Sequence, residues 1–421
     1  MEVVVVLLGI SFILFFGFFS EFIFKRLSIP DVLFLIVLGF VLGPNVLGYV
    51  SADSVAGVAP VFTTFTLLFL LFDGAFNINL SSLVREFSQS FFLTTFNFFI
   101  SAGLVLLVMW IAGFPILVSV LAGFLLGGVS SSFVIPILNE LKISPNVYSL
   151  LTLEGALTDV FCIVFSLAVM EIINYGNFGV RQVLTELASL FAVAGLVGLV
   201  GGVVWIVLTI RVFKEHNYVM VVAYLLLIYV LTEFLKGNGA IAALFFGLML
   251  KNSKQLSSIV KGIEKKTKVK KKVMNGELGV SVTTPSEEYF YHQLSFLLKT
   301  FFFVYIGLLI DISDTKALII GGILSVMLMS SRLASLLLTR DMSPENRSLV
   351  NSMFARGLAA AVIAQLALEA GIPQADFLIR VAFITITGTI ILSSIRVLFV
   401  KLRMPANNGK AGKNGRGTGS K

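Results

Sequence analysis

Residues 150 to 165 read Leu-Leu-Thr-Leu-Glu-Gly-Ala-Leu-Thr-Asp-Val-Phe-Cys-Ile-Val-Phe, and they decide the class of fold because they place two carboxylates inside a long apolar run. An ionised carboxylate at the centre of a bilayer costs roughly 2.5 to 3.5 kcal/mol on insertion scales, so Glu154 and Asp159 each need a cation, a proton or a basic side chain as partner. At about 100° per residue, the five-residue step sets the two acids about 140° apart around a helix. One acid can therefore be held by the protein while the other faces a water-filled path.

The composition predicts an all-α polytopic membrane protein. Of the 421 residues, 57% are hydrophobic and only 13% are charged, and the mean hydropathy is +0.99. This leaves too little polar material to cover a soluble globular protein. The single cysteine excludes a disulfide framework and a cysteine-based metal site, and two histidines leave little for a histidine cluster. The net charge of +8 lies mostly beside apolar segments, so we expect contact with membrane lipid and no nucleic-acid partner.

Hydrophobic runs predict about thirteen transmembrane helices. An odd number of spans places the two termini on opposite sides of the membrane. Loops assigned to the inside carry nine lysines between 251 and 272 and most other basic residues, whereas loops assigned to the outside carry only Arg181, Lys236 and Lys316. The positive-inside rule therefore predicts a multi-pass cell-membrane protein with its amino terminus outside and its carboxyl terminus in the cytoplasm. The spans are 2–24, 29–49, 57–76, 88–111, 115–138, 147–172, 183–210, 217–235, 238–250, 289–310, 317–338, 349–370 and 375–400.

Polar segments divide the chain into four parts. Residues 1–250 hold spans one to nine, residues 251–288 form a basic cytoplasmic loop, and residues 289–403 hold spans ten to thirteen. The loop is either a solvated tether or a segment attracted to anionic lipid. The basic tail 404–421 is rich in Gly, Asn and Lys, and we expect it to be disordered.

The fifth span contains Gly127-Gly-Val-Ser-Ser-Ser-Phe-Val-Ile-Pro136, which predicts a weak point in the middle of the helix. A broken helix is tolerated at membrane depth where its freed backbone groups line a cavity, and unwound carbonyls can coordinate a cation. The small residues could equally serve close helix packing. The next span carries Asp159, which favours the cation-binding interpretation.

Few other charges lie at membrane depth. Arg332 sits well inside its span and is the natural counter-ion for Glu154. Lys299 lies eleven residues into the tenth span and is a further candidate functional cation. Arg356 opens a second Gly/Ala-rich stretch near the cytoplasmic side, where snorkelling would explain it. Asp73 ends the third span, either as an interfacial acid or as part of an ion path.

These motifs, in this order, resemble the cation/proton antiporter superfamily, most closely the sodium/proton exchanger branch with its NhaP-type proteins. The resemblance covers residues 1 to 400. It rests on Leu71-Phe-Asp-Gly-Ala75, Glu154 with Asp159, Gly237-Asn-Gly-Ala-Ile-Ala-Ala-Leu-Phe-Phe-Gly-Leu248, Thr300-Phe-Phe-Phe-Val-Tyr-Ile-Gly-Leu-Leu-Ile-Asp311, Arg332, and Arg356-Gly-Leu-Ala-Ala-Ala-Val-Ile363.

The resemblance implies a non-enzymatic transporter built from inverted repeats, with two unwound crossing helices in spans five and twelve. It implies that Asp159 binds the metal ion and the proton in turn, and that Glu154 and Arg332 form a structural ion pair. It further implies a homodimer with a separate dimerisation domain and a mobile core, and no cofactor besides the transported monovalent cation and H⁺. The remaining ion or proton ligands would be Thr158, Val129, Ser130, Ser131, Ser132 and Asp73.

Three departures from the family pattern keep alternatives open. Thr158 stands where electroneutral members usually have Asn and electrogenic members Asp, Val129-Ser-Ser replaces Thr-Asp-Pro, and Gly155 replaces a hydroxyl residue. With Asp159 alone titrating, exchange would be electroneutral and would use Na⁺ or Li⁺ in pH homeostasis, unless Lys299 releases a proton of its own. The first alternative is a K⁺/H⁺ antiporter or a K⁺-coupled regulator. The second is a channel-like or sensory protein on the same fold.

Overall fold

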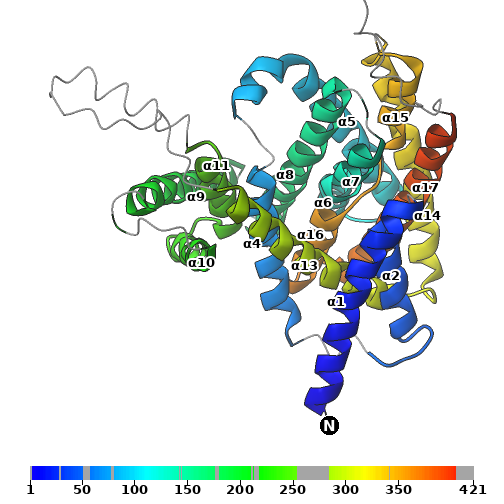
Figure 1. Cartoon of the computed structure of the whole chain (residues 1–421), viewed down its shortest axis with the longest axis horizontal. Coiled ribbons are helices and arrows are strands. Elements are labelled where there is room, and N and C mark those ends of the chain that lie inside the picture. The colour runs from blue at the N-terminus through cyan, green and yellow to red at the C-terminus, as the bar shows by residue number, and fades with distance from the viewer. Residues whose placement is uncertain are drawn as a thin grey trace, which may run out of the picture.

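The computed structural model describes residues 2–27, 30–50, 57–76, 80–141, 143, 145–175, 180–209, 212, 218–253, 284–340 and 342–403. Within these ranges the chain is helical and contains no strand (Figure 1). Most of the basic loop, from 254 to 283, and the tail from 404 onward lie outside the described residues.

The amino-terminal helices are α1 (Glu2–Leu27), α2 (Asp31–Leu42), α4 (Ala59–Phe76), α5 (Leu80–Ile111), α6 (Ile116–Gly127), α7 (Ser131–Leu141), α8 (Pro145–Tyr175), α9 (Val180–Leu208), α10 (Tyr218–Phe234) and α11 (Gly239–Lys251). The carboxy-terminal ones are α13 (Pro285–Leu309), α14 (Thr315–Ser331), the 3₁₀ helix η2 (Arg332–Leu337), α15 (Pro344–Ser352), α16 (Leu358–Glu369) and α17 (Ala375–Arg403).

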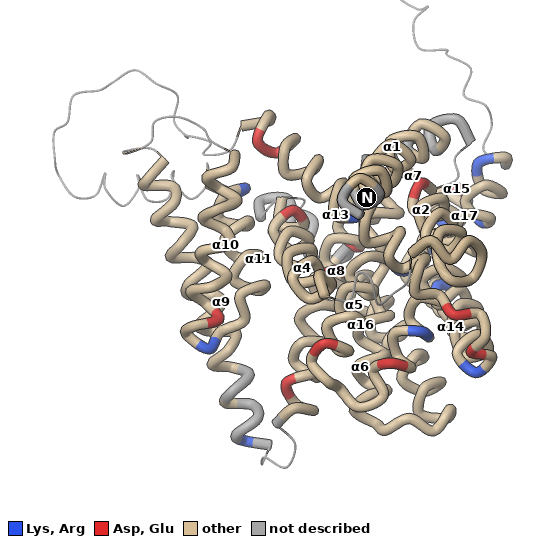
Figure 2. The backbone as a smooth tube through the Cα atoms, turned by 90° about the horizontal axis from the view of Figure 1, so that it is seen from below, with Lys and Arg blue, Asp and Glu red and all other residues tan. Residues whose placement is uncertain are grey.

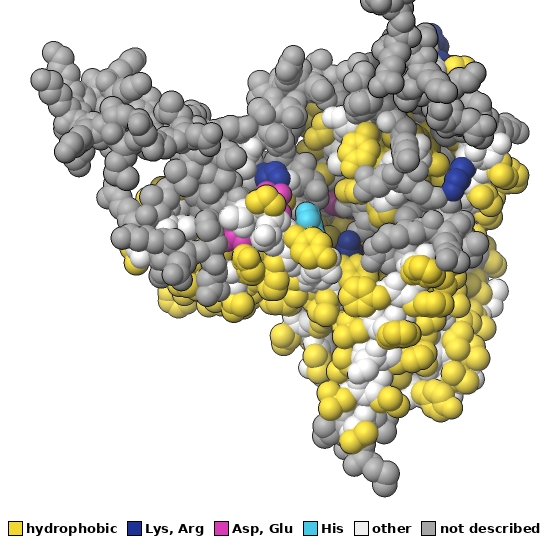
Figure 3. Space-filling view, in the orientation of Figure 1, with side chains coloured by type: hydrophobic (Ala, Val, Ile, Leu, Met, Phe, Trp, Pro, Cys, Tyr) yellow, Lys and Arg dark blue, Asp and Glu magenta, His cyan; other side chains and the backbone are white. Residues whose placement is uncertain are grey.

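Every predicted span contains one helix or two consecutive helices, although in the second span, 29–49, the helix ends at Leu42. In the described part of the chain, eight helical stretches are long and apolar enough to cross a membrane, and five shorter apolar helices account for the other spans. Large hydrophobic side chains cover much of the exposed surface (Figure 3), as a lipid-facing surface requires. The all-α polytopic fold is therefore confirmed, while the number of thirteen crossings stays a prediction.

Helix α13 begins earlier than the hydrophobic pattern predicts. The predicted tenth span starts at residue 289, but the helix starts at Pro285, so residues 285–288 belong to the helix and not to the basic loop. Thr284 and Glu287 form a capping box, in which each side chain bonds the other residue's backbone N–H. Such a box satisfies the free N–H groups of a first turn and lets the helix start among polar residues.

Two helices are broken at the same depth, and their breaks meet. Helix α6 ends at Gly127, and α7 starts at Ser131. Residues 353–357 are likewise non-helical between α15 and α16. The N–H of Ser130 donates to the carbonyl of Ala355 at 2.9 Å, and Gly357 lies so close that a side chain there would collide with Ser130. The unwound crossing pair predicted for spans five and twelve is thus present.

The helices on either side of these breaks repeat one pattern. A long helix, a broken helix and a long helix follow one another in α5 to α8 and again in α14 to α17. The two sets are seven predicted spans apart, so they run through the membrane in opposite directions if every span crosses. This is the arrangement of an inverted repeat.

The helices are described as two bundles, and the closest contacts at glycines lie within each of them. Wherever a Cβ on a described glycine would come within 3.0 Å of a neighbouring atom, that atom belongs to the same bundle. In the first bundle, a Cβ on Gly247 of α11 would lie 2.8 Å from the Phe72 carbonyl of α4; in the second, one on Gly123 of α6 would lie 2.6 Å from the Ala102 carbonyl of α5. The first bundle is α1, α2, α4, α9, α10, α11 and α13, and the second is α5 to α8 with α14 to α17.

The first bundle is drawn out to one side of the molecule. Helices α9, α10 and α11 stand together at one edge, both in the ribbon view and in the view from below (Figures 1 and 2). Helices α4 and α13 lie next to the second bundle, because both contact α16. The seam between the two bundles therefore runs along α4 and α13 on one side and α7, α8 and α16 on the other.

Candidate functional site

The Asp159 carboxylate faces a cavity in the seam between the bundles. The cavity has a volume of about 310 Å³, and Asp159 reaches it from α8. The hydroxyl of Ser131, the first residue of α7, donates to Asp159 Oδ2 at 2.5 Å. The break between α6 and α7 therefore delivers a hydroxyl directly to this acid. The cavity is lined by Leu70, Leu71, Asp73 and Gly74 of α4, Ser131, Ser132, Ile135 and Pro136 of α7, Ala156, Asp159, Val160 and Ile163 of α8, and His292, Ser295 and Lys299 of α13.

An acid and a histidine lie at the more exposed end of this cavity. Asp73 Oδ1 is 2.7 Å from His292 Nδ1, and the His292 side chain is 46% exposed. Charged and histidine side chains gather around a hollow in the middle of the face shown in Figure 3. Asp73 therefore lines the cavity, and a role for it in an ion path stays a prediction.

The hydrophobic pattern does not single out His292, because this residue lies close to the basic loop. A usable signal was present, since His292, Ser295 and Lys299 are spaced three and four residues apart and so share one face of a helix. All three line the cavity. Lys299 lies two turns beyond His292 and lines the same cavity as Asp159.

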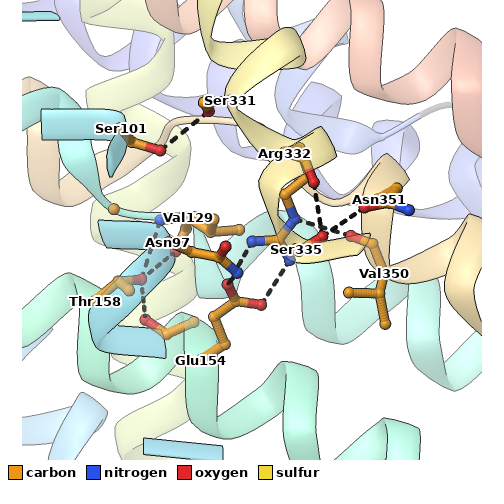
Figure 4. A network of polar contacts seen from close by, with 12 residues as sticks. Asn97, Ser101, Val129, Glu154, Thr158, Ser331, Arg332, Ser335, Val350 and Asn351 are labelled. Carbon is orange, nitrogen blue, oxygen red and sulfur yellow. Dashed lines mark hydrogen bonds and ion pairs between the residues drawn. The ribbon is translucent and has the colours of Figure 1, made fainter. Parts of the chain in front are cut away.

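Glu154 and Arg332 form a buried ion pair, as the resemblance implied (Figure 4). Their side chains are 1% and 3% exposed, and Arg332 Nη2 donates to Glu154 Oε2 at 2.6 Å while Nη1 donates to Oε1. Asn97 also donates to Oε1, at 3.0 Å, and Arg332 Nε donates to the Val350 carbonyl at 2.9 Å. Desolvated charges need such additional hydrogen bonds to be tolerated. Nothing in the sequence pattern of α5 singled out Asn97.

Three of the predicted ion ligands lie beside the cavity but do not line it. Thr158 Oγ1 accepts a hydrogen bond from Val129 N at 3.0 Å and lies 3.2 Å from the carbonyls of Val129 and Gly155, so it ties the α6–α7 break to α8. Val129 and Thr158 line a smaller enclosed cavity that they share with Glu154. Ser130 lies in the crossing with residues 353–357. A direct role of these three in binding a cation stays a prediction.

Arg356 is buried at the crossing, so the expectation that it snorkels toward the membrane surface is wrong. Its side chain belongs to the non-helical segment 353–357 and is 1% exposed. Arg356 Nη1 donates to the Gly127 carbonyl at 3.0 Å and also to the Gly128 carbonyl. These are the free carbonyls at the carboxyl end of α6, where a helix carries partial negative charge. The guanidinium therefore neutralises one half-helix from within the other broken helix.

The oxygen donors at the level of the helix break are one acid and two neutral hydroxyls. In the described ranges, no group of three or more His, Cys, Asp and Glu residues could hold a metal ion. The acid at the level of the break is instead supplemented by the neutral hydroxyls of Ser131 and Ser132. One negative charge with neutral oxygen ligands can be balanced either by a monovalent cation or by a proton.

Comparison with known proteins identifies the family and the fold of this chain. The family model described as "Sodium/hydrogen exchanger, transmembrane" matches residues 10–401. A structure of the sodium proton antiporter MjNhaP1 from Methanocaldococcus jannaschii at pH 8 has a TM-score of 0.74 at 21% identity, covering 94% of this chain and all of that one. An electron-microscopy structure of the same antiporter gives 0.70 at 20% identity, covering 98% and 100%. The fold is that of a multi-pass transporter, and the chain belongs to the sodium/hydrogen exchanger family.

Proposed function

We propose that this protein exchanges a monovalent cation for a proton across the membrane, with Asp159 binding the two in turn. The observation that carries the proposal is the difference between two acids on one helix. Glu154 is buried and neutralised by Arg332, whereas Asp159 faces the cavity in the seam. Only Asp159 is free to take its counter-charge from solution.

Coupling follows from the cost of moving a bare charge. An ionised carboxylate at membrane depth costs roughly 2.5 to 3.5 kcal/mol, so the second bundle moves Asp159 between the two sides only with a cation or a proton bound. Ser131 and Ser132, which line the cavity beside Asp159, replace water around the cation. Each movement of Asp159 in one direction with a bound cation is thus matched by a return movement with a bound proton.

We propose Na⁺ or Li⁺ as the cation, exchanged one for one with H⁺. The family to which the chain belongs and the sodium proton antiporter MjNhaP1, which shares its fold, support Na⁺. The one-to-one ratio follows from charge, because Thr158 is neutral and Glu154 is committed to Arg332.

The cavity opens toward the cytoplasm in this proposal. His292 lies near the amino-terminal end of α13, next to the pair in which Lys251 Nζ bonds Glu288 at 3.1 Å. This pair flanks the lysine-rich segment between α11 and α13, which the positive-inside rule assigns to the cytoplasm. We further propose that two copies associate in the cell membrane, to be tested by the mass of the purified protein in detergent.

The decisive experiment is exchange by the Asp159→Asn variant in proteoliposomes. Dissipation of a pH gradient is followed with Na⁺, Li⁺ and K⁺ at clamped potential. The variant is expected to fall to the rate of empty liposomes, because asparagine cannot take up a proton or neutralise a cation. Wild-type rates in Asp159→Asn would remove this acid from its role.

Asp311→Asn is the matched control. This carboxylate lies in the loop after α13, and hydrogen bonds from Ser313 lower its pKa, so it stays ionised over the pH range of the assay. Its removal is expected to leave the exchange rate and its pH dependence unchanged.

The same assay tests potassium exchange as the second candidate. What favours K⁺ is that Ser130 stands in the helix break where the sodium/proton exchanger branch usually has an aspartate. Faster gradient dissipation with K⁺ than with Na⁺ or Li⁺ would establish that alternative, and no cation-dependent dissipation would leave the channel-like or sensory role.

A further inference from the structure

The seam between the bundles is open at one end of α13 and closed toward the other. His292, Ser295 and Lys299 line the cavity in that order along the helix. Beyond Lys299 the residues of α13 no longer line the cavity and instead pack against other helices. Phe302, for example, is fully buried and stacks on Phe62 of α4 with ring centroids 6.0 Å apart. A path from Asp159 along α13 to the far side of the membrane has to pass these packed residues.

A hydrogen bond crosses the seam in this closed region. Tyr305 Oη of α13 donates to Gln365 Oε1 of α16 at 3.2 Å, and Gln365 Nε2 donates to Glu369 Oε1 at 3.1 Å. Gln365 is 4% exposed, whereas Glu369 is exposed at the end of α16. Tyr305 lies six residues beyond Lys299, which is about 9 Å further along the helix axis. The hydrogen bond therefore lies between the site and the surface opposite the cavity mouth.

Tyr305 and Gln365 belong to two different bundles, and each is part of a closely packed group of helices. Helix α13 is fixed to α2 through Gly39 and Gly307, because a Cβ on either glycine would collide with the other helix's backbone. At the other side, Gly357 immediately precedes α16 and lies against Ser130 with no room for a side chain. Between α13 and α16 there is no such glycine contact among the described residues. A relative movement of the bundles would thus break the Tyr305–Gln365 hydrogen bond before it deformed either side.

We propose that Tyr305 and Gln365 form a latch that closes the external side of the cation path while the cavity is open to the cytoplasm. The latch rests on the proposed function, because it presumes that the two bundles move past each other to carry the cation. Glu369 holds the Gln365 amide so that its carbonyl oxygen faces Tyr305. Tyr305 and Gln365 are positioning residues, since neither lines the Asp159 cavity.

The test measures accessibility from each side and needs no transport. One reporter cysteine replaces Ala361, which is buried one helical turn before Gln365 on the same face of α16. A second reporter replaces Ser295 in the cavity lining. Membrane-impermeant maleimide is applied to the external side for the first and to the cytoplasmic side for the second. Cys162, the single native cysteine, is buried and supplies the background in variants without a reporter.

Tyr305→Phe removes only the hydroxyl, and Gln365→Leu removes its acceptor. Because a hydrogen bond has a net worth of about 1 kcal/mol, each change is expected to raise external labelling at the Ala361 reporter about two- to tenfold. The double variant should add little to the larger single effect, since both remove the same bond. Cytoplasmic labelling at the Ser295 reporter should fall at the same time. Tyr289→Phe, at an exposed tyrosine of α13, is the matched control and should change neither rate.

Equal labelling of Tyr305→Phe and Tyr289→Phe would overturn the latch. So would a rise at both reporters, because general loosening of the packing increases accessibility from both sides. These results are independent of the exchange assay. Reciprocal labelling in a protein whose Asp159→Asn variant still exchanges ions would keep the latch and remove the proposed function of Asp159.

Discussion

At the scale of single residues, two acids five positions apart on α8 have opposite surroundings. Glu154 has a guanidinium and an amide around it, whereas Asp159 has a serine hydroxyl and a cavity. The chemical difference between Glu and Asp is too small to explain this. The neighbours that α5, α7 and η2 bring to each side of α8 decide which acid is structural and which can exchange its counter-ion.

Glu154→Gln tests the structural role at this scale. The substitution leaves the Arg332 charge buried without a partner, and breaking a buried pair in this way costs about 3 to 5 kcal/mol. We expect a clearly lower midpoint of thermal unfolding in detergent. Asp159→Asn, which breaks no ion pair, should not lower it.

The double variant Glu154→Leu with Arg332→Met is the informative comparison. Replacing both charges by apolar side chains of similar size is often neutral, so most of the lost stability should return. A double variant no more stable than Glu154→Gln would contradict the ion pair as the cause.

At the scale of elements, the break between α6 and α7 is held in place from three directions. Thr158 of α8 bonds the backbone of Val129, Arg356 bonds the last carbonyls of α6, and Ser130 bonds Ala355 in the opposite break. Unwound backbone in a membrane needs such partners, because no lipid group can supply them. Each broken helix therefore depends on the other.

Gly155→Ala tests how closely α8 must approach this break. A Cβ at residue 155 would lie 3.0 Å from Ser131 Cα, so the serine that bonds Asp159 has to shift. Overpacking costs about 1 to 3 kcal/mol. Because the strain falls on the ion site, we expect the KM for the cation to rise about 5- to 100-fold, measured as exchange against cation concentration.

The control for this prediction is Gly103→Ala in α5, where a Cβ would meet nothing within 4 Å. This variant should keep the wild-type KM, and alanine's higher helix propensity should leave its stability equal or slightly greater. An unchanged KM in Gly155→Ala would show that Ser131 does not have to stay where it is for the cation to bind.

At the scale of the whole molecule, the charge carried through one cycle decides whether membrane potential drives exchange. Each net charge moved experiences about 2.3 kcal/mol per 100 mV. With Asp159 alone exchanging its counter-ion, the cycle moves no net charge, and we expect the same exchange rate at 0 and −100 mV in proteoliposomes. Lys299→Gln should also be insensitive to potential.

Lys299 is the residue that could make exchange depend on membrane potential, because it lines the same cavity as Asp159. If wild-type exchange responded to potential and Lys299→Gln did not, the lysine would be releasing a proton in each cycle, and the one-to-one ratio would be wrong.

The sequence by itself determined the class of the molecule, most of its helices and the break in span five. The break in span twelve was expected after Arg356 but lies at residues 353–357, before α16 begins at Leu358. Hydropathy, charge asymmetry and the Gly/Ser run 127–132 are local properties, so they can be read without knowing what lies nearby. Only the tertiary structure decided which polar groups meet. The structure shows Asn97 as a partner of Glu154 and His292 as a partner of Asp73. It also shows Arg356 buried at the helix crossing and not near the membrane surface, where it was expected. These pairings join residues that are far apart in the chain, and the physical reason is that helix packing, not sequence spacing, sets which faces come together.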